Sequence, residues 1–169
     1  MRLSQSDTAA GLKRAIEGRI QALANVHALF AQSRWIGAEL TSLVAQELAP
    51  YRRDGEARVR IDGPKVLLEP STAQMVAVIL HELATNAAKY GALSVSEGHV
   101  QVEWPRAIDG RLVLRWTELG GPPVKTPTRQ GFGTRVMGWI TSQHKSEMHL
   151  DWRAEGLACE IALNVTKDT

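Results

Sequence analysis

The chain has 169 residues, of which 44% are hydrophobic, and a formal net charge of +2. This suits one ordinary domain with an additional element and argues against disorder, while the single cysteine, Cys159, excludes an intramolecular disulfide. The small, scattered charge indicates no nucleic-acid surface, and no apolar run approaches the roughly 18 residues of a membrane span, so we expect a cytoplasmic protein that contacts neither.

The first third of the chain is predicted to form two helices and then two strands. Apolar residues recur at helical spacing over residues 8–32 and again over 38–48. Alternation of apolar and polar residues then predicts a pair of short strands over 57–61 and 66–68.

A long helix is predicted over residues 72–90, where apolar residues follow the i, i+3, i+4, i+7 pattern of a core-facing stripe. Ser71 and Gln74 fit a capping box at its start. Gly91 follows it and is expected to take the left-handed conformation that closes a helix.

The last third alternates strand pairs with a loop and a helix. The expected elements are strands 100–104 and 112–116 joined through Asp109-Gly110, a loop over 119–133, a helix over 134–143, and strands 148–152 and 157–163. Strands that come in pairs predict a mixed, largely antiparallel sheet covered on one face by helices. The fold class is therefore an α/β (α+β) two-layer sandwich, without the βαβ alternation of a Rossmann fold.

An unusual polar stripe follows the long helix beside its core face, formed by Glu82, Thr85, Asn86 and Lys89. Asn and Thr are mediocre helix formers, so helix propensity does not explain them. An amide oxygen can ligate a hard cation, a lysine can reach phosphate oxygens, and a glutamate can polarise a hydroxyl or water. The stripe favours a magnesium–phosphate ligand.

Two later segments carry complementary chemistry. Glu118 is expected just after a strand end and before two glycines, where a carboxylate can accept a hydrogen bond from an exocyclic amino group such as that of adenine. Gly131 and Gly133 open the next predicted helix, and a helix N-terminus suits phosphate. The spacing is not that of a P-loop.

Together, residues 81–94, 116–123 and 131–136 resemble the HWE sensor histidine kinases, within the histidine kinase and gyrase-type ATPase superfamily. His81 matches the histidine of the asparagine box, and Trp116 with Glu118 matches the Trp-x-Glu of the first glycine box. The resemblance covers about residues 19–165 and implies a Bergerat-type ATP-binding fold.

The resemblance also implies a role for each matching position. Asn86 would ligate magnesium bridging the ATP phosphates, and Glu82, with His81 beside it, would orient the attacking group or water. Residues 119–133 would form an ATP lid. The other ATP-binding residues implied are Lys89, Tyr90, Glu118, Gly120, Gly131, Gly133 and Thr134.

The phosphoacceptor histidine of the family is not found here, because residues 19–30 resemble the second helix of the dimerisation hairpin. We therefore expect a helical remnant of that hairpin over residues 1–34 and an ATP-binding catalytic domain over 35–169. The γ-phosphate would pass to a histidine outside this chain and then to a response-regulator receiver domain. Full-length family members are often homodimers, and we do not expect autophosphorylation within this chain.

The residues alone leave alternatives open. His81 also fits a partly buried structural histidine, and Lys89 a solvated helix lysine. The chain as a whole also fits a non-catalytic adaptor that keeps the fold to bind a protein, or a serine-directed kinase or ATPase of the same superfamily.

Overall fold

The computed structural model describes residues 9–32, 36–52, 58–124 and 131–165. The elements are α1 (Ala9–Gln32), β1 (Ala38–Glu39), α2 (Leu40–Leu48), a 3₁₀ turn (Ala49–Tyr51), β2 (Val59–Asp62), β3 (Leu67–Leu68), α3 (Pro70–Lys89), a second 3₁₀ turn (Ala92–Ser94), β4 (His99–Glu103), β5 (Arg111–Leu119), α4 (Phe132–Gln143), β6 (Glu147–Arg153) and β7 (Gly156–Asn164). Within these residues, none of the helices combines the length and apolar character needed to cross a membrane.

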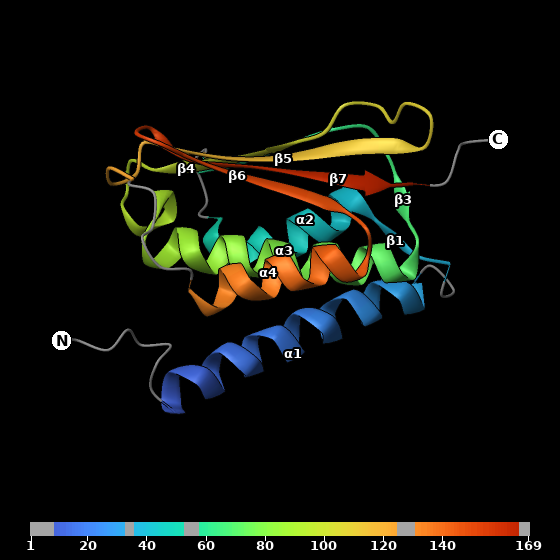
Figure 1. The fold of residues 1–169 in the computed structure, drawn as a ribbon, viewed down its shortest axis with the longest axis horizontal. Coiled ribbons are helices and arrows are strands. Elements are labelled where there is room, and N and C mark those ends of the chain that lie inside the picture. Colours follow the sequence, from blue (N-terminus) through green and yellow to red (C-terminus); the bar gives the residue numbers. More distant parts are fainter. Residues whose placement is uncertain (1–8, 33–35, 53–57, 125–130, 166–169) are drawn as a thin grey trace.

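A five-stranded sheet in the order β2-β4-β5-β7-β6 forms one layer, and β1 pairs with β3 beside it. Helices α2, α3 and α4 cover one face of the large sheet (Figure 1). The predicted two-layer sandwich is confirmed, and so are the two later hairpins, whose strands pair antiparallel as β4–β5 and β6–β7. The sheet is mixed because β2 runs parallel to β4.

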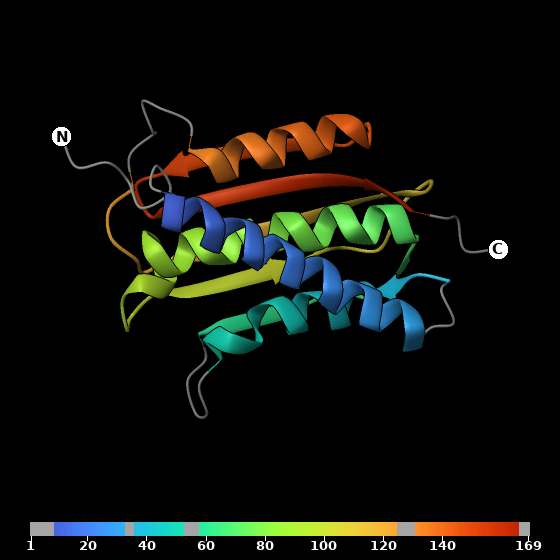
Figure 2. The same cartoon turned by 90° about the horizontal axis from the view of Figure 1, so that it is seen from below.

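Helix α1 lies outside this sandwich, on the far side of the helix layer (Figure 1). Seen from below, it crosses over α3 between α2 and α4 (Figure 2). Its buried residues Val26 and Phe30 belong to the same hydrophobic core as the helix layer. The division of the chain at 34/35 stays a prediction, since residues 33–35 lie outside the described part.

The expected pairing of the first two strands with each other is wrong, because β2 pairs with β4 and β3 with β1. The segment that follows β2 is held against Trp104 instead of turning back. The Trp104 indole N–H donates to the Pro64 carbonyl at 2.8 Å, and its ring lies so close to Gly63 that a Cβ there would overlap it. Proline also lacks the N–H that a tight two-stranded ladder needs.

Both predicted end signals of the long helix are wrong. Helix α3 begins at Pro70, with Glu69 as an N-cap that makes no side-chain hydrogen bond, so the capping box at Ser71 is not used. A proline at the first helical position fixes the start two residues earlier. Gly91 has φ −111° and is not left-handed; a glycine is needed there because a Cβ would overlap the Glu118 carboxylate.

Candidate functional site

Two adjoining cavities lie between α3 and the start of α4. The larger, about 500 Å³, contains Glu82 in its wall and is called here the Glu82 cavity. The smaller, about 340 Å³, has Glu118 in its wall and is called the Glu118 cavity. They form one elongated site, because four residues line both: Asn86, Tyr90, Gly131 and Thr134.

The Glu118 cavity is built against the sheet. The sequence had predicted Glu118 just after a strand end, but the residue lies within β5. Its side chain points inward beside Trp116 because both residues occupy the buried face of the strand. The Trp116 indole N–H donates to Glu118 Oε2 at 3.0 Å, and the Ala92 backbone N–H donates to Oε1 at 3.1 Å. The carboxylate is therefore fixed at both oxygens.

Burial governs the electrostatics of Glu118, which is only 4% exposed. Desolvation raises the pKa of its carboxyl group above the ordinary value of 4.5, and the hydrogen bonds from Trp116 and Ala92 oppose that rise only in part. Each carboxylate oxygen still has a second lone pair. The group can accept one more hydrogen bond from a ligand in the cavity.

The Glu82 cavity is walled by three helices. Glu82, Asn86 and Lys89 come from the predicted polar stripe of α3, while Gly131, Gly133 and Thr134 lie at the start of α4. The third wall is α1, whose contribution was not predicted. It consists of Gly11, Arg14, Ala15, Gly18 and Arg19.

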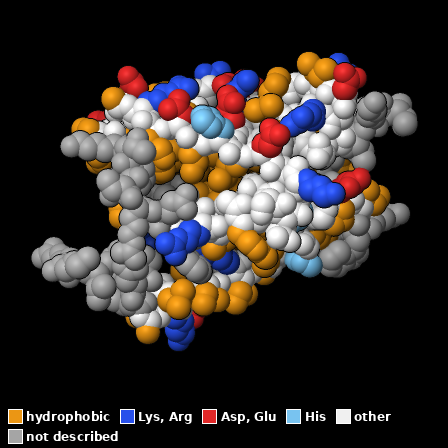
Figure 3. All heavy atoms as spheres, viewed as in Figure 1, with side chains coloured by type: hydrophobic (Ala, Val, Ile, Leu, Met, Phe, Trp, Pro, Cys, Tyr) orange, Lys and Arg blue, Asp and Glu red, His pale blue; other side chains and the backbone are white. Residues whose placement is uncertain are grey.

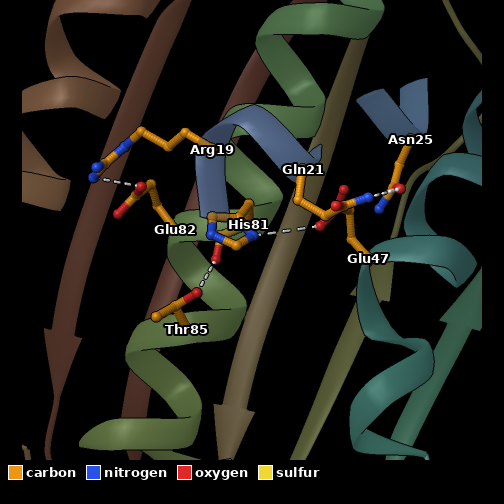
Figure 4. Close-up of polar contacts among 7 residues, drawn as sticks. All are labelled: Arg19, Gln21, Asn25, Glu47, His81, Glu82 and Thr85. Atoms are coloured by element: carbon orange, nitrogen blue, oxygen red, sulfur yellow. Dashed lines mark hydrogen bonds and ion pairs between the residues drawn. The ribbon is translucent and has the colours of Figure 1, made fainter. Parts of the chain in front are cut away.

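Glu82 is held by a cation from α1. Arg19 Nη2 lies 2.6 Å from Glu82 Oε1, with the two side chains 14% and 7% exposed (Figure 4). The other carboxylate oxygen lies against Gly133, where a Cβ would overlap Oε2. The carboxylate is thus enclosed between α1 and the start of α4.

His81 sits where α1, α2 and α3 meet, and it also lines the Glu82 cavity. Its Nδ1 lies 3.7 Å from Glu47 Oε2 on α2 (Figure 4). On the other side, a Cβ built on Gly18 of α1 would come within 2.6 Å of Nε2. Its backbone carbonyl accepts a hydrogen bond from the Thr85 hydroxyl at 2.7 Å.

All but one of the predicted site residues line one of these cavities. Gly120 is the exception: it has φ +73°, and its close neighbour is the Glu97 carbonyl, 2.8 Å from a Cβ built there. Its backbone therefore makes room for a turn and not for a cavity. Of the predicted lid over 119–133, residues 125–130 lie outside the described part of the chain.

Sequence reasoning missed the roles of several neighbours. Trp116 was matched to the Trp-x-Glu motif but given no contact of its own, although the i, i+2 spacing to Glu118 puts both on one strand face and could have indicated their contact. Trp152 and Leu157, from the β6–β7 hairpin, wall the Glu118 cavity, and no local motif marks them.

The described residues offer a metal ion few side-chain ligands at this site. Among the described residues, no group of three or more His, Cys, Asp and Glu side chains comes together to hold one. The Asn86 amide offers a hard oxygen donor. One such donor fits magnesium, since this ion keeps several of its waters and is held in proteins by few side-chain oxygens together with the phosphates of the substrate. On the face seen in Figure 3, acidic and basic side chains are interspersed.

Comparison with known proteins identifies relatives over almost the whole chain. A family model described as HWE histidine kinase matches residues 1–65. A blue-light-activated histidine kinase of Rhizobium johnstonii is 35% identical over 165 residues, which is 96% of this chain and 47% of the relative. A second, from Brucella anthropi, is 32% identical over 154 residues, 89% of this chain and 31% of the relative. The chain thus spans less than half the length of these curated relatives.

Solved structures share the fold. The histidine kinase domain from the Erythrobacter litoralis EL346 blue-light activated histidine kinase matches with a TM-score of 0.68 at 15% identity, over 95% of this chain and 79% of that one. The catalytic domain of the histidine kinase ThkA matches with a TM-score of 0.55 at 13% identity, over 76% of this chain and 95% of that one. The first match includes nearly all of this chain, whereas the second leaves out about a quarter of it.

Proposed function

The chain belongs to the HWE histidine kinase family, and on that premise we propose that its two cavities bind ATP for transfer of the γ-phosphoryl group to a histidine. One observation carries the proposal: the two cavities adjoin and share four lining residues, Asn86, Tyr90, Gly131 and Thr134. One elongated site then offers a buried acceptor at one end and cations with free backbone N–H groups at the other.

The Glu118 cavity suits adenine. Its fixed carboxylate can accept a hydrogen bond from the exocyclic amino group, and a charged acceptor makes that bond stronger than a neutral one would. Val124, Trp152 and Leu157 supply apolar walls for a flat base. Tyr90, 65% exposed at the junction of the cavities, is placed to flank the nucleotide.

The Glu82 cavity suits the phosphates. Helix α4 begins at Phe132, and Gly131 caps it without a side-chain hydrogen bond. The N–H groups of its first turn, including those of Gly133 and Thr134, have no acceptor within the helix and can donate to phosphate oxygens. Lys89 adds a positive charge from α3.

Asn86 would hold magnesium at the junction of the cavities through its amide oxygen. The ion, when bound, would supply charge neutralisation between the phosphates. Glu82 would orient the attacking imidazole, or a water, by accepting its proton-bearing nitrogen or oxygen in a hydrogen bond. Catalysis by these residues is mainly positioning and electrostatic stabilisation.

The phosphoacceptor hairpin is the proposed protein partner nearest this site, with a receiver domain as the next acceptor. The outer face of α1 carries Leu12, Ile16 and Ile20, which are 41%, 46% and 60% exposed and spaced four residues apart. Figure 3 shows hydrophobic side chains along the lower edge of the molecule, where α1 lies in the matching view of Figure 1. An apolar stripe of this kind supports the proposal that residues 1–34 pair with another helix of a hairpin.

Isothermal titration tests ATP binding. With magnesium and a non-hydrolysable ATP analogue, we expect saturable binding that Asn86→Ala weakens by about 100-fold or more, the loss of a metal-bridging contact. Asn164→Ala, an exposed amide on β7, is the matched control and should bind like wild type. Equal binding by Asn86→Ala and wild type would favour the adaptor function.

The chemistry of the product tests the acceptor. The chain is incubated with ATP labelled at the γ-phosphate and with a hairpin polypeptide that carries the family's acceptor histidine. Label that is acid-labile and alkali-stable indicates phosphohistidine. Alkali-labile label would instead support the serine-directed kinase.

A further inference from the structure

The contact between α1 and Glu82 differs from the other ion pairs between fixed charges in the described part of the chain. Those pairs are exposed, as Arg115–Glu160 illustrates with side chains 45% and 54% exposed. Arg19 and Glu82 are 14% and 7% exposed and 2.6 Å apart. A buried pair contributes little net stability after desolvation, so its presence at a site points to the control of geometry.

The pair fixes the position of the carboxylate on both sides. Arg19 takes Oε1, and the backbone of Gly133 closes against Oε2, so that the glutamate is held between an element outside the sandwich and the start of α4. A guanidinium is planar and directional, so it sets the orientation of its partner more firmly than an ammonium group would.

The docking of α1 is also built into its sequence. Gly11, Ala15, Gly18 and Ala22 repeat on the face toward α3, and the first three of them line the Glu82 cavity. Gly18 packs on His81 so closely that a Cβ would lie 2.6 Å from Nε2. Consecutive residues of α1, 18 and 19, therefore meet consecutive residues of α3, 81 and 82.

We propose that Arg19 is a positioning residue for Glu82, so that the carboxylate holds its working orientation only while α1 is docked. The inference rests on the proposed function of the site and adds to it a residue from the hairpin region. Any displacement of α1 along or away from α3 would be transmitted to Glu82 through this ion pair. A signal arriving through α1 would thereby change the reactivity of the site without touching the nucleotide.

The test compares Arg19→Ala with Arg19→Lys and with Lys13→Ala, an exposed cation on the same helix. We expect Arg19→Ala to lower the maximal rate of phosphoryl transfer by roughly 10- to 100-fold, as for a misplaced catalytic group, with ADP affinity changed less than about threefold. Arg19→Lys should recover part of the rate, and Lys13→Ala should match wild type. An unchanged or increased rate in Arg19→Ala would overturn the proposal.

A double-mutant cycle separates this inference from the proposed function. Hydrogen exchange of the α1 amides is measured in wild type, Arg19→Ala, Glu82→Gln and the double variant. We expect each single variant to increase exchange in α1 and the double variant to add little more, as for two partners of one interaction. Additive effects would overturn the coupling, even if the rate falls. If wild type fails to bind ADP, the proposed function is wrong. The cycle would still show whether Arg19 and Glu82 are coupled, because hydrogen exchange is measured without nucleotide.

Discussion

The two ends of the site hold their acids in different ways. Glu118 is oriented by Trp116 on its own strand and by Ala92 just beyond α3, so both partners belong to the sandwich. Glu82 is oriented by Arg19, which belongs to a helix outside it. The Glu118 cavity is therefore preorganised by the core, whereas the geometry of the Glu82 cavity depends on how α1 is docked.

This difference separates binding from control. An end that is fixed by the core can recognise a base in the same way at all times. An end that is completed by a separate helix can be altered by moving that helix, at low cost to the rest of the fold. Four predictions challenge or sharpen the comparison.

The largest effect is expected from Trp116→Phe. Loss of the indole N–H leaves Glu118 Oε2 without its donor in the core, and the smaller ring leaves a cavity, so we expect a destabilisation of about 2–4 kcal/mol. Adenine nucleotide affinity should also fall about tenfold. Urea unfolding and titration with ADP measure the two effects.

Trp104→Phe is the matched control for this variant. Trp104 is also buried and also donates its indole N–H, but to the Pro64 carbonyl at 2.8 Å, away from both cavities. It should lower stability by a similar amount and leave ADP affinity unchanged. If both variants weaken ADP binding equally, the role assigned to Trp116 fails.

A pair of glycine substitutions compares the two ends directly. In Gly91→Ala the new Cβ overlaps the Glu118 carboxylate and approaches the Ala87 Cα to 3.1 Å, within packed surroundings, so we expect a loss of about 1–3 kcal/mol. In Gly18→Ala the Cβ meets the tip of the His81 ring at 2.6 Å. A gain of about 1 kcal/mol in helix propensity offsets that contact, and α1 can shift outward.

Unfolding by urea measures the stability of both glycine variants, and hydrogen exchange measures the docking of α1. Gly91→Ala should unfold at a lower urea concentration, while the α1 amides of the folded protein keep their protection from hydrogen exchange. Gly18→Ala should keep its free energy of unfolding within about 1 kcal/mol of wild type and lose protection of the α1 amides. The reverse pattern would contradict the assignment of a rigid and an adjustable end.

The sequence predicted the α3 stripe well because periodicity alone puts Glu82, Asn86 and Lys89 on one helix face. The later hairpins were predicted for the same reason, through alternation and the turn at Asp109-Gly110. These features depend on neighbours in the chain.

Features that depend on distant segments were not predicted. The pairing of β2 with β4 and the contact of Arg19 with Glu82 join residues 40 or more positions apart, and no local pattern encodes such a partner. The close approach of α1 left a trace in Gly11 and Gly18, whose small size allows it. Gly91 was predicted for its conformational freedom and proved necessary for space, since it faces the Glu118 carboxylate.

The third prediction concerns pH. Burial raises the pKa of Glu118, so its carboxylate takes up a proton at a higher pH in the folded protein than in the unfolded chain. Its contribution to stability is full below the unfolded pKa and is lost as pH rises through the folded pKa. Binding has the opposite sign, because the adenine amino group prefers the charged acceptor. Affinity should therefore fall on acidification, starting at a pH above 4.5, the ordinary pKa.

Adenosine is the suitable probe for this pH dependence, since it has no phosphate to titrate. Titrations between pH 8 and pH 5 should show weaker binding at the acidic end in wild type and a flat, weak profile in Glu118→Gln. In that variant the amide NH₂ also faces one of the two fixed donors. A flat profile in wild type would show that Glu118 does not contact the base.

The smallest effect of a substitution is expected from Arg19→Ala on the reactivity of Cys159, which lies opposite Trp116 in the β5–β7 ladder. Burial, with smaller contributions from Glu160 and Glu118, raises the pKa of its thiol to about 12. Only the thiolate is alkylated, so iodoacetamide at pH 8 should react about 1,000-fold more slowly than with the unfolded chain. Arg19→Ala should leave this rate unchanged, because undocking of α1 does not open the sheet. Faster labelling in that variant would show that the Glu118 end also depends on α1, and the contrast between the two ends would not hold.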